Sequence, residues 1–299
     1  MHIDEVPIDT ALVHELVAAQ FPQWVDLPLT PVESAGTVNV IHRLGDELAV
    51  RVPRIPQPDM GSTGRERLLT RLASLLPLPI PHVVAHGGPE RGYPGGWTVE
   101  RWLPGTSADR TPPDDLDAAA RDLAGFLATL HAVDPGAAPP AGAATGTRGL
   151  PIATPDKHAT VQRGIDALAD EFGPEVLRSV WQRAVAAPEW AGAPVWFHGD
   201  VMPGNVLVEA GRVSAVIDFE QTGAGDPACD MAVGWNLLDR GSRAVLRTAL
   251  DIDDATWDRG RGWALWSALA AIPYYRDTNP KFVAVQRRTL EQITADTAD

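Results

Sequence analysis

The decisive stretch of this chain is residues 196–205, which read Trp-Phe-His-Gly-Asp-Val-Met-Pro-Gly-Asn. An apolar run follows, then a turn at Gly211 and a second apolar run that ends at Asp218. This spacing predicts that Asp200, Asn205 and Asp218 lie at the ends of adjacent short strands. One carboxamide and two carboxylates in that arrangement can hold a metal-bound phosphate beside a hydroxyl nucleophile.

Each of these three side chains has a predicted role. Asp200 is the candidate catalytic residue, because a carboxylate within hydrogen-bond reach of a hydroxyl can orient it and accept its proton. Asn205 and Asp218 are candidate Mg²⁺ ligands, since Mg²⁺ bound to phosphates favours a small set of oxygen ligands. His198 is one residue removed from Asp200, so in an extended segment its ring points away from that carboxylate. We therefore expect His198 to bond to backbone and steady the loop.

Composition sets the outer limits. The chain has 299 residues, enough for one large domain or two moderate lobes, and its 44% hydrophobic and 21% charged residues are ordinary for a soluble globular protein. A formal net charge of −14 argues against a nucleic-acid partner, which would be bound by clustered Lys and Arg. We expect a cytoplasmic protein with no membrane partner, because no apolar run approaches the ~20 residues of a membrane helix and the N-terminus lacks a secretory signal. The single cysteine, Cys229, is expected to be a buried packing residue.

The organisation of the chain changes once. Hydrophobic periodicity and turn residues predict a mixed first part and a mostly helical second part, with the boundary near residue 103. Expected helices and strands of the first part are helix 10–20, strands 29–33, 38–44 and 47–53, helix 62–76, and strands 83–86 and 97–102. Expected helices of the second part are 114–133, 158–172, 174–187, 227–239, 242–250, 254–275 and 279–297. Residues 134–156 are rich in Pro, Gly and Ala and are expected to form an irregular loop, either functional or disordered.

Three segments carry a family resemblance. His198-Gly-Asp200 with Asn205, then residues 217–220 (Ile-Asp-Phe-Glu), then residues 225–230 (Gly-Asp-Pro-Ala-Cys-Asp) resemble the aminoglycoside phosphotransferase family. The loop at 36–39 and the strand at 48–54 also resemble that family's nucleotide-covering loop and phosphate-facing strand. The resemblance therefore spans approximately residues 30–240.

The resemblance implies an α+β, two-lobed protein-kinase-like fold. A small antiparallel-sheet N-lobe with one main helix, residues 1–102, would bind nucleotide. A larger, mostly helical C-lobe, residues 103–299, would carry the catalytic loop, the metal site and the substrate-binding helices. Asp200 would be the base, Asn205 and Asp218 would bind Mg²⁺, and ATP or GTP would be the phosphate donor.

The resemblance also implies contacts to the nucleotide. Its candidate residues are Arg51, Glu66, Ser34, Gly36, Thr37, Glu100 and Trp102. Arg51 departs from the family pattern, which has a lysine at this position. The planar guanidinium of arginine keeps the positive charge but would contact a nucleotide phosphate with a different geometry. Glu66 is the expected partner of Arg51, although Thr63 and Glu66 also have the spacing of a capping box. Asp226 and Asp230 would brace the catalytic loop and start the next helix.

The acceptor is expected between the catalytic loop and the C-terminal helices. Residues of suitable type there are Glu220, Trp235, Asp239, Tyr274 and Asp277. Acidic groups suit an aminoglycoside. A bulky macrolide would suit the aromatic surface of the C-terminal helices, although helical spacing places most of these residues in the core: Trp257, Trp263, Trp266, Tyr274 and Tyr275. The resemblance thus implies a kinase that phosphorylates a hydroxyl of an antibiotic-like molecule and gives resistance. Two alternatives stay open, a kinase of a small metabolite such as an amino alcohol or sugar, and a nucleotide-binding pseudokinase.

Overall fold

The computed structural model describes residues 6–32, 38–56, 63–136, 138–143 and 146–296. The chain forms two compact units, which are unit 1 (residues 1–75 and 79–104) and unit 2 (residues 76–78 and 105–299). Unit 1 is built on an antiparallel sheet and unit 2 is mostly helical, which confirms the predicted protein-kinase-like fold class. Within the described ranges, no helix is long and apolar enough to cross a membrane.

Unit 1 contains a five-stranded sheet in the order β1-β2-β3-β5-β4, with each neighbouring pair antiparallel. Its elements are α1 (Thr10–Gln20), β1 (Leu29–Pro31), β2 (Asn39–Leu44), β3 (Leu48–Pro53), α2 (Thr63–Ala73), β4 (Val83–Gly87) and β5 (Trp97–Arg101), with a short 3-10 turn at Pro22–Trp24. The predicted hairpin between β2 and β3 is confirmed, with Leu44 opposite Leu48. Gly45 turns the chain there at φ +61°, a conformation that glycine adopts without a steric penalty.

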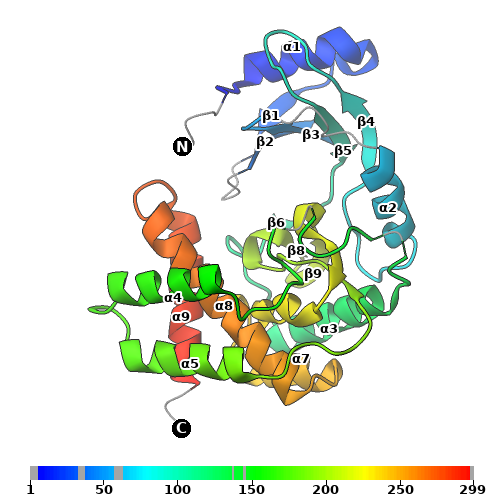
Figure 1. Ribbon diagram of the computed structural model, residues 1–299. Coiled ribbons are helices and arrows are strands. Elements are labelled where there is room, and N and C mark those ends of the chain that lie inside the picture. The colour runs from blue at the N-terminus through cyan, green and yellow to red at the C-terminus, as the bar shows by residue number, and fades with distance from the viewer. Residues whose placement is uncertain (1–5, 33–37, 57–62, 137, 144–145, 297–299) are drawn as a thin grey trace. The chain divides into compact units, whose positions relative to one another are not determined.

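The core of unit 1 lies between α1 and the sheet (Figure 1). Asp9 caps α1 by accepting a 2.8 Å hydrogen bond from the backbone N of Leu12. Trp97 is fully buried and fits because Gly87 has no side chain; a Cβ on Gly87 would lie 1.9 Å from Trp97 Cε2. The core is formed by Val13, Leu16, Val17, Leu44, Leu48, Val50, Val52, Tyr93, Trp97 and Val99.

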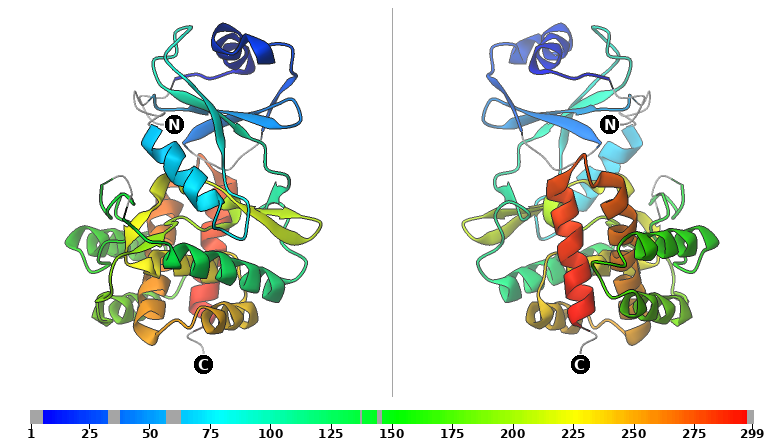
Figure 2. Two further views of the ribbon diagram at one scale, coloured as in Figure 1. Left: turned by 90° about the vertical axis from the view of Figure 1, so that its right-hand side faces the viewer. Right: turned by 90° about the vertical axis from the view of Figure 1, so that its left-hand side faces the viewer.

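Unit 2 is arranged around its longest helix, α8 (Figures 1 and 2). Its helices are α3 (Leu116–Ala132), α4 (Pro155–Ala167), α5 (Pro174–Ala186), α6 (Val233–Asn236), α7 (Arg240–Ala249), α8 (Asp254–Tyr275) and α9 (Pro280–Ala295). Its strands are β6 (Thr106–Ser107), β7 (Val195–Phe197), β8 (Val206–Glu209), β9 (Arg212–Val216) and β10 (Gly223–Gly225). Helices α4, α5 and α9 pack against α8, while α7 packs against α3.

Close packing against α8 explains one wrong prediction. Residues 227–239 were expected to form a single helix, but they form a 3-10 segment, η4 (Pro227–Ala232), and the four-residue α6. η4 lies so near α8 that a Cβ on Gly260 would be 2.4 Å from Met231 Cβ. Tertiary packing and the fixed position of Asp230 thus override the helical pattern. The small pairings made by β6 and β10 were also missed, because strands of two and three residues carry almost no periodicity.

Candidate active site

The candidate catalytic loop (residues 198–205, hereafter the catalytic loop) begins where β7 ends. β7 pairs with β10 in antiparallel fashion, which fixes Phe197 opposite Gly223. Gly199 then turns the chain at φ +84°, and a Cβ at that position would lie 2.7 Å from the carbonyl oxygen of Gln221. A residue with a side chain would therefore be strained and would clash, so glycine is required for Asp200 to take its place.

Asp230 fixes this loop by accepting hydrogen bonds from its backbone. Its Oδ2 accepts a 3.1 Å hydrogen bond from the backbone N of His198, and its Oδ1 accepts a 2.7 Å bond from the backbone N of Gly199. His131 on α3 places Nε2 3.0 Å from the same Oδ2. Since the Asp230 side chain is fully buried, it serves as an internal brace, as the resemblance implies.

Asp226 braces the neighbouring segment. It caps η4, accepting a 3.0 Å hydrogen bond from the backbone N of Ala228. Both of its oxygens also receive bonds from Arg259 on α8, at 2.8 Å from Nε and 3.1 Å from one terminal nitrogen. Asp226 therefore both caps η4 and ties it to α8 through Arg259.

His198 has the structural role expected from the sequence. Its Nδ1 accepts a 3.2 Å bond from the backbone N of Asp200, and its Nε2 lies 3.1 Å from the carbonyl oxygen of Ile217. The ring packs edge-on against Phe219, with centroids 4.5 Å apart. His198 thus ties the catalytic loop to the segment that carries Asp218.

Asn205 and Asp218 flank the Asp200 carboxylate. Asn205 Nδ2 donates to the Asp200 backbone O at 2.9 Å and to Asp200 Oδ2 at 3.0 Å. Asp218 is in the left-handed conformation at φ +65°, directly before η3 (Phe219–Gln221). Burial raises the pKa of Asp200, the guanidinium of Arg148 opposes that rise, and the charge of Asp218 adds to it. The structure therefore brings together the three residues that the spacing singles out.

The donor set fits a magnesium ion that is shared with phosphate. The Asn205 amide turns its nitrogen toward Asp200, which leaves the amide oxygen as the end able to ligate a cation. Asp218 supplies a carboxylate, and both are the hard oxygen donors that Mg²⁺ prefers. Across the described ranges, no group of three or more His, Cys, Asp or Glu side chains could hold a metal ion.

Sequence reasoning missed Arg148, which lies in the irregular loop before α4. Its Nε donates a 2.7 Å hydrogen bond to the carbonyl oxygen of Gly199, and a terminal nitrogen lies 3.6 Å from Asp200 Oδ1. Nothing in the surrounding Gly- and Ala-rich sequence distinguishes this arginine. The contact shows that at least this part of the loop belongs to the site.

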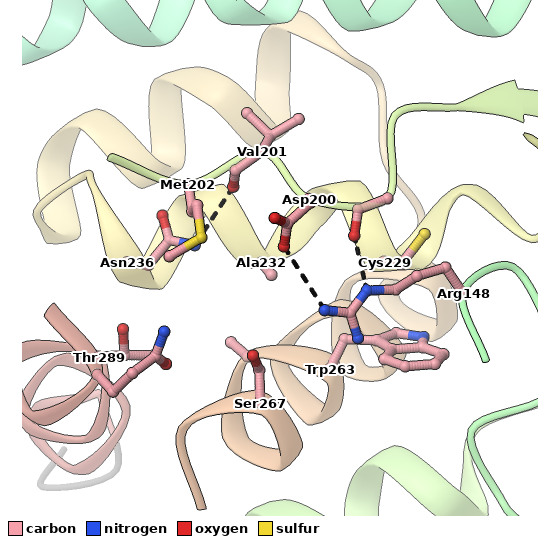
Figure 3. Close-up of a pocket in the computed structure, with 13 residues that line it drawn as sticks. Arg148, Asp200, Val201, Met202, Cys229, Ala232, Asn236, Trp263, Ser267 and Thr289 are labelled. Carbon is pink, nitrogen blue, oxygen red and sulfur yellow. Dashed lines mark hydrogen bonds and ion pairs between the residues drawn. The ribbon is translucent and has the colours of Figure 1, made fainter. Parts of the chain in front are cut away.

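A pocket opens beside Asp200 (Figure 3). Its walls come from the catalytic loop, from η4 and α6, and from α8 and α9, with Arg148 at one edge. The figure shows the Arg148 guanidinium beside the Trp263 ring and directed toward Asp200. The residues lining it are Arg148, Gly199, Asp200, Val201, Met202, Cys229, Ala232, Asn236, Trp263, Ala264, Ser267, Gln286 and Thr289.

Trp263, one of the aromatic residues expected near the acceptor, lines this pocket, whereas none of the other predicted substrate residues does so: Glu220, Trp235, Asp239, Tyr274 and Asp277. Trp235 is fully buried and donates through Nε1 to Asp296, while Asp239 caps α7 in a capping box with Ser242. These two have packing and capping roles that the sequence pattern could not separate from ligand contact. Glu220 lies half-buried in η3, whereas Tyr274 and Asp277 are exposed at the end of α8, and their part in substrate binding stays a prediction. Cys229 is buried, as predicted.

The predicted nucleotide contacts belong to unit 1. Ser34, Gly36 and Thr37 lie outside the described residues. Arg51 lies on the central strand β3, opposite Ile41 and Thr98. The structure brings Glu66 together with His86 of β4, at 2.9 Å between Oε2 and Nε2, and the predicted Arg51–Glu66 pairing stays a prediction.

The two remaining nucleotide candidates are at the end of β5. Glu100 Oε1 accepts a 3.0 Å bond from Thr98, and the Trp102 ring faces Arg43 at 5.2 Å. Their contact with a nucleotide base also stays a prediction.

Comparison with known proteins agrees with this geometry. The chain matches the phosphotransferase enzyme family over residues 29–292. It is similar in structure to a GDP complex of aminoglycoside 2'-phosphotransferase-IIIa, with 18% identity, 97% of this chain and 99% of that chain covered, and a TM-score of 0.66. It is also similar to macrolide 2'-phosphotransferase type I, with 23% identity, coverage of 95% and 98%, and a TM-score of 0.61.

A third similar structure is the apoenzyme of macrolide 2'-phosphotransferase MphH from Brachybacterium faecium, with 24% identity, coverage of 96% and 99%, and a TM-score of 0.58. No curated protein matches the chain in sequence. These structural likenesses establish the fold, and the match over most of the chain establishes the family. The chain therefore belongs to the phosphotransferase enzyme family and is a small-molecule kinase.

Proposed function

We propose that this protein transfers the terminal phosphate of ATP or GTP to a hydroxyl of an antibiotic-like small molecule, an aminoglycoside or a macrolide. The observation that carries the proposal is the position of Asp200, which lines a pocket while its other side is held by Asn205. The similar structures named above include kinases of both antibiotic classes. An enzyme of this kind acting in the cytoplasm would give resistance.

The chemistry follows from the placement of each group. Asp200 would orient the acceptor hydroxyl and take its proton as the oxygen bonds to the terminal phosphorus, while the bond to the nucleoside diphosphate breaks. Asn205 and Asp218 would hold Mg²⁺, which when bound offsets the charge of the phosphates. Arg51 is the proposed anchor for nucleotide phosphate. Positioning and fixed electrostatics would supply most of the rate increase.

A transfer assay tests the proposal. Radiolabelled ATP and GTP are incubated with the protein, Mg²⁺ and a panel of aminoglycosides, macrolides, amino alcohols and sugars, and phosphate incorporation is measured. We expect an antibiotic to be the most efficient acceptor. Far higher efficiency with a metabolite would replace the antibiotic assignment by the metabolite-kinase alternative.

The pseudokinase alternative is separated by combining that assay with thermal unfolding. A nucleotide present at 100 times its dissociation constant should stabilise the fold by about 2.7 kcal/mol. Stabilisation by Mg²⁺ and nucleotide, together with transfer to an acceptor, is the expected result. Stabilisation without transfer to any acceptor and without hydrolysis would instead support a pseudokinase.

A further inference from the structure

The pocket beside Asp200 contains very little negative charge. Among the described residues that line it, Asp200 is the one carboxylate and Arg148 is the one cation. The other polar groups are neutral and come from α6, α8 and α9, namely Asn236, Ser267, Gln286 and Thr289. A molecule with several ammonium groups would find no carboxylate here except the one that the reaction needs.

Arg148 is fixed in this pocket by contacts on three sides. Its Nε is bonded to the carbonyl oxygen of Gly199 at 2.7 Å. Its guanidinium lies 5.3 Å from the ring centroid of Trp263 and 5.2 Å from that of Trp266, and the two indoles meet edge to face. The arginine side chain is only 12% exposed. Because swinging away would lose the bond and both aromatic contacts, the positive charge is held at the catalytic carboxylate.

A second buried cation lies behind the same aromatic ring. Lys157 on α4 places Nζ 5.0 Å from the Trp263 centroid and donates a 3.1 Å hydrogen bond to the carbonyl oxygen of Pro151. Burial lowers the pKa of Lys157, and the charge of Arg148 lowers it further. Both basic side chains thus lie close to the Trp263 ring, at 5.3 Å for Arg148 and 5.0 Å for Lys157.

The neutral polar groups suit an oxygen-rich ligand. Asn236 is 8% exposed, and its Nδ2 bonds to the carbonyl oxygen of Val201, whereas its buried Oδ1 has no hydrogen-bond partner within the described residues. Ser267 and Gln286 have side chains that both donate and accept, whereas Thr289 already donates its hydroxyl to the carbonyl oxygen of Val285 at 3.0 Å and keeps its lone pairs for accepting.

We propose that Arg148 is a specificity-determining residue, which favours acceptors with neutral oxygen groups beside the reacting hydroxyl and rejects acceptors with an ammonium group there. This inference rests on the proposed function, and narrows its acceptor class. An ammonium next to the hydroxyl would be brought close to a fixed guanidinium in a partly desolvated site, where like charges repel strongly. A neutral substituent at the same place avoids that repulsion and can bond to the amide and hydroxyl groups of the wall.

The test compares acceptors in which an ammonium is replaced by a neutral amide, and the Arg148 variants separate the effect of charge from the effect of the added acetyl group. Aminoglycosides with their amines intact and the same compounds after N-acetylation are assayed with labelled nucleotide, together with a macrolide as a bulky acceptor. For each protein variant the ratio of kcat/KM between the acetylated and the amine form is taken, so that a loss of folded protein cancels. We expect wild type to favour the acetylated form by about tenfold or more.

Three variants test whether the charge of Arg148 causes this preference between acceptors. Arg148→Gln should reduce the ratio about tenfold by removing the charge. Arg148→Lys keeps the charge but loses the Nε bond to Gly199 and the planar indole contacts, so its ratio should lie between those of wild type and Arg148→Gln. Arg163→Gln removes one positive charge from the exposed face of α4 and is the matched control, for which the ratio should stay at the wild-type value. A wild-type preference for the amine form, or a ratio that Arg148→Gln leaves unchanged, would overturn the inference.

Failure of the proposed function gives a different result. If nucleotide binds but no acceptor in either form is phosphorylated, the proposed function fails and the inference that rests on it fails too. If transfer occurs without any dependence on residue 148, the proposed function stands and only the inference is overturned.

Discussion

Asp230 Oδ1 accepts a 2.7 Å hydrogen bond from the backbone N of Gly199, the residue directly before the candidate catalytic aspartate. A fully buried carboxylate from η4 thus fixes the catalytic loop through its main chain. The contact joins residues 31 positions apart, so the position of Asp200 depends on the packing of the whole helical unit.

Replacing this brace should weaken both the fold and the rate. Asp230→Ala leaves the N–H groups of His198 and Gly199 buried without an acceptor, and each such group costs about 1–3 kcal/mol. We expect a lower free energy of unfolding in urea and a lower kcat. Asp230→Asn keeps one acceptor oxygen and should lie between the alanine variant and wild type. Wild-type stability in Asp230→Ala would contradict the bracing role.

Gly199 should be intolerant of any side chain. Alanine there would adopt a left-handed conformation, which costs about 1–2 kcal/mol, and would also clash with the carbonyl oxygen of Gln221. Urea unfolding and steady-state kinetics should both show a defect for Gly199→Ala. Gly125→Ala is the matched control, because a Cβ at this exposed position of α3 meets nothing within 4 Å and should stabilise the helix by about 0.5–1 kcal/mol. Equal stability of the two variants would refute the explanation.

The Asp226–Arg259 pair should be much more important than surface pairs. Arg259→Met removes one partner of a buried bidentate pair and leaves the Asp226 carboxylate without its counter-ion, which typically costs about 3–5 kcal/mol. Arg178→Met breaks an exposed pair with Glu175 on α5 and should cost less than about 1 kcal/mol. Free energies of unfolding in urea compare the two. A loss below 1 kcal/mol for Arg259→Met would show that the pair contributes little.

The stability of unit 1 should depend on pH through His42. Burial lowers the pKa of this histidine, which is 2% exposed and places Nε2 3.1 Å from Thr10 Oγ1, while Asp9 opposes the shift. Between the lowered folded pKa and the unfolded value of about 6.5, the unfolded chain binds a proton that the folded chain does not. Stability should therefore fall as pH drops below about 6.5.

Unfolding in urea at pH 5 to 8 measures this effect. His42→Gln removes the titrating group and should flatten the loss of stability at low pH. An unchanged pH dependence in this variant would assign the loss to other groups.

Local sequence patterns were sufficient where the structure is local. Asp200, Asn205 and Asp218 lie within 19 residues, in the loop after β7, in a 3-10 turn and after β9, so a short stretch of chain brings them together. The expected adjacent strands are wrong in one respect, because β7 pairs with β10 whereas β9 pairs with β8 in a different sheet. The hairpin at Gly45 and the helices α1, α3 and α8 were also predicted, because turn residues and apolar periodicity act over a few positions.

The pocket beside Asp200 could not be predicted in this way. It brings Arg148 from a loop beside Asn236 from α6 and Gln286 from α9, residues whose sequence neighbours contain no shared pattern. Trp235 and Asp239 had suitable chemistry for a ligand, but burial and capping determine their roles. Residues 227–239 do not form the single helix that their pattern predicts, because the segment packs closely against Gly260 of α8. Contacts between residues so far apart in the sequence can be seen only in the folded structure.

The most direct measurement is the turnover of the Asp200→Asn variant, compared with its nucleotide affinity. Asparagine preserves the size of the side chain and can still contact Asn205, but it cannot accept the acceptor's proton. We predict that nucleotide affinity, measured by calorimetry, stays close to the wild-type value, while kcat for phosphate transfer falls by about 10²–10⁴. Near-normal turnover in this variant would contradict the assignment of Asp200 as the catalytic base.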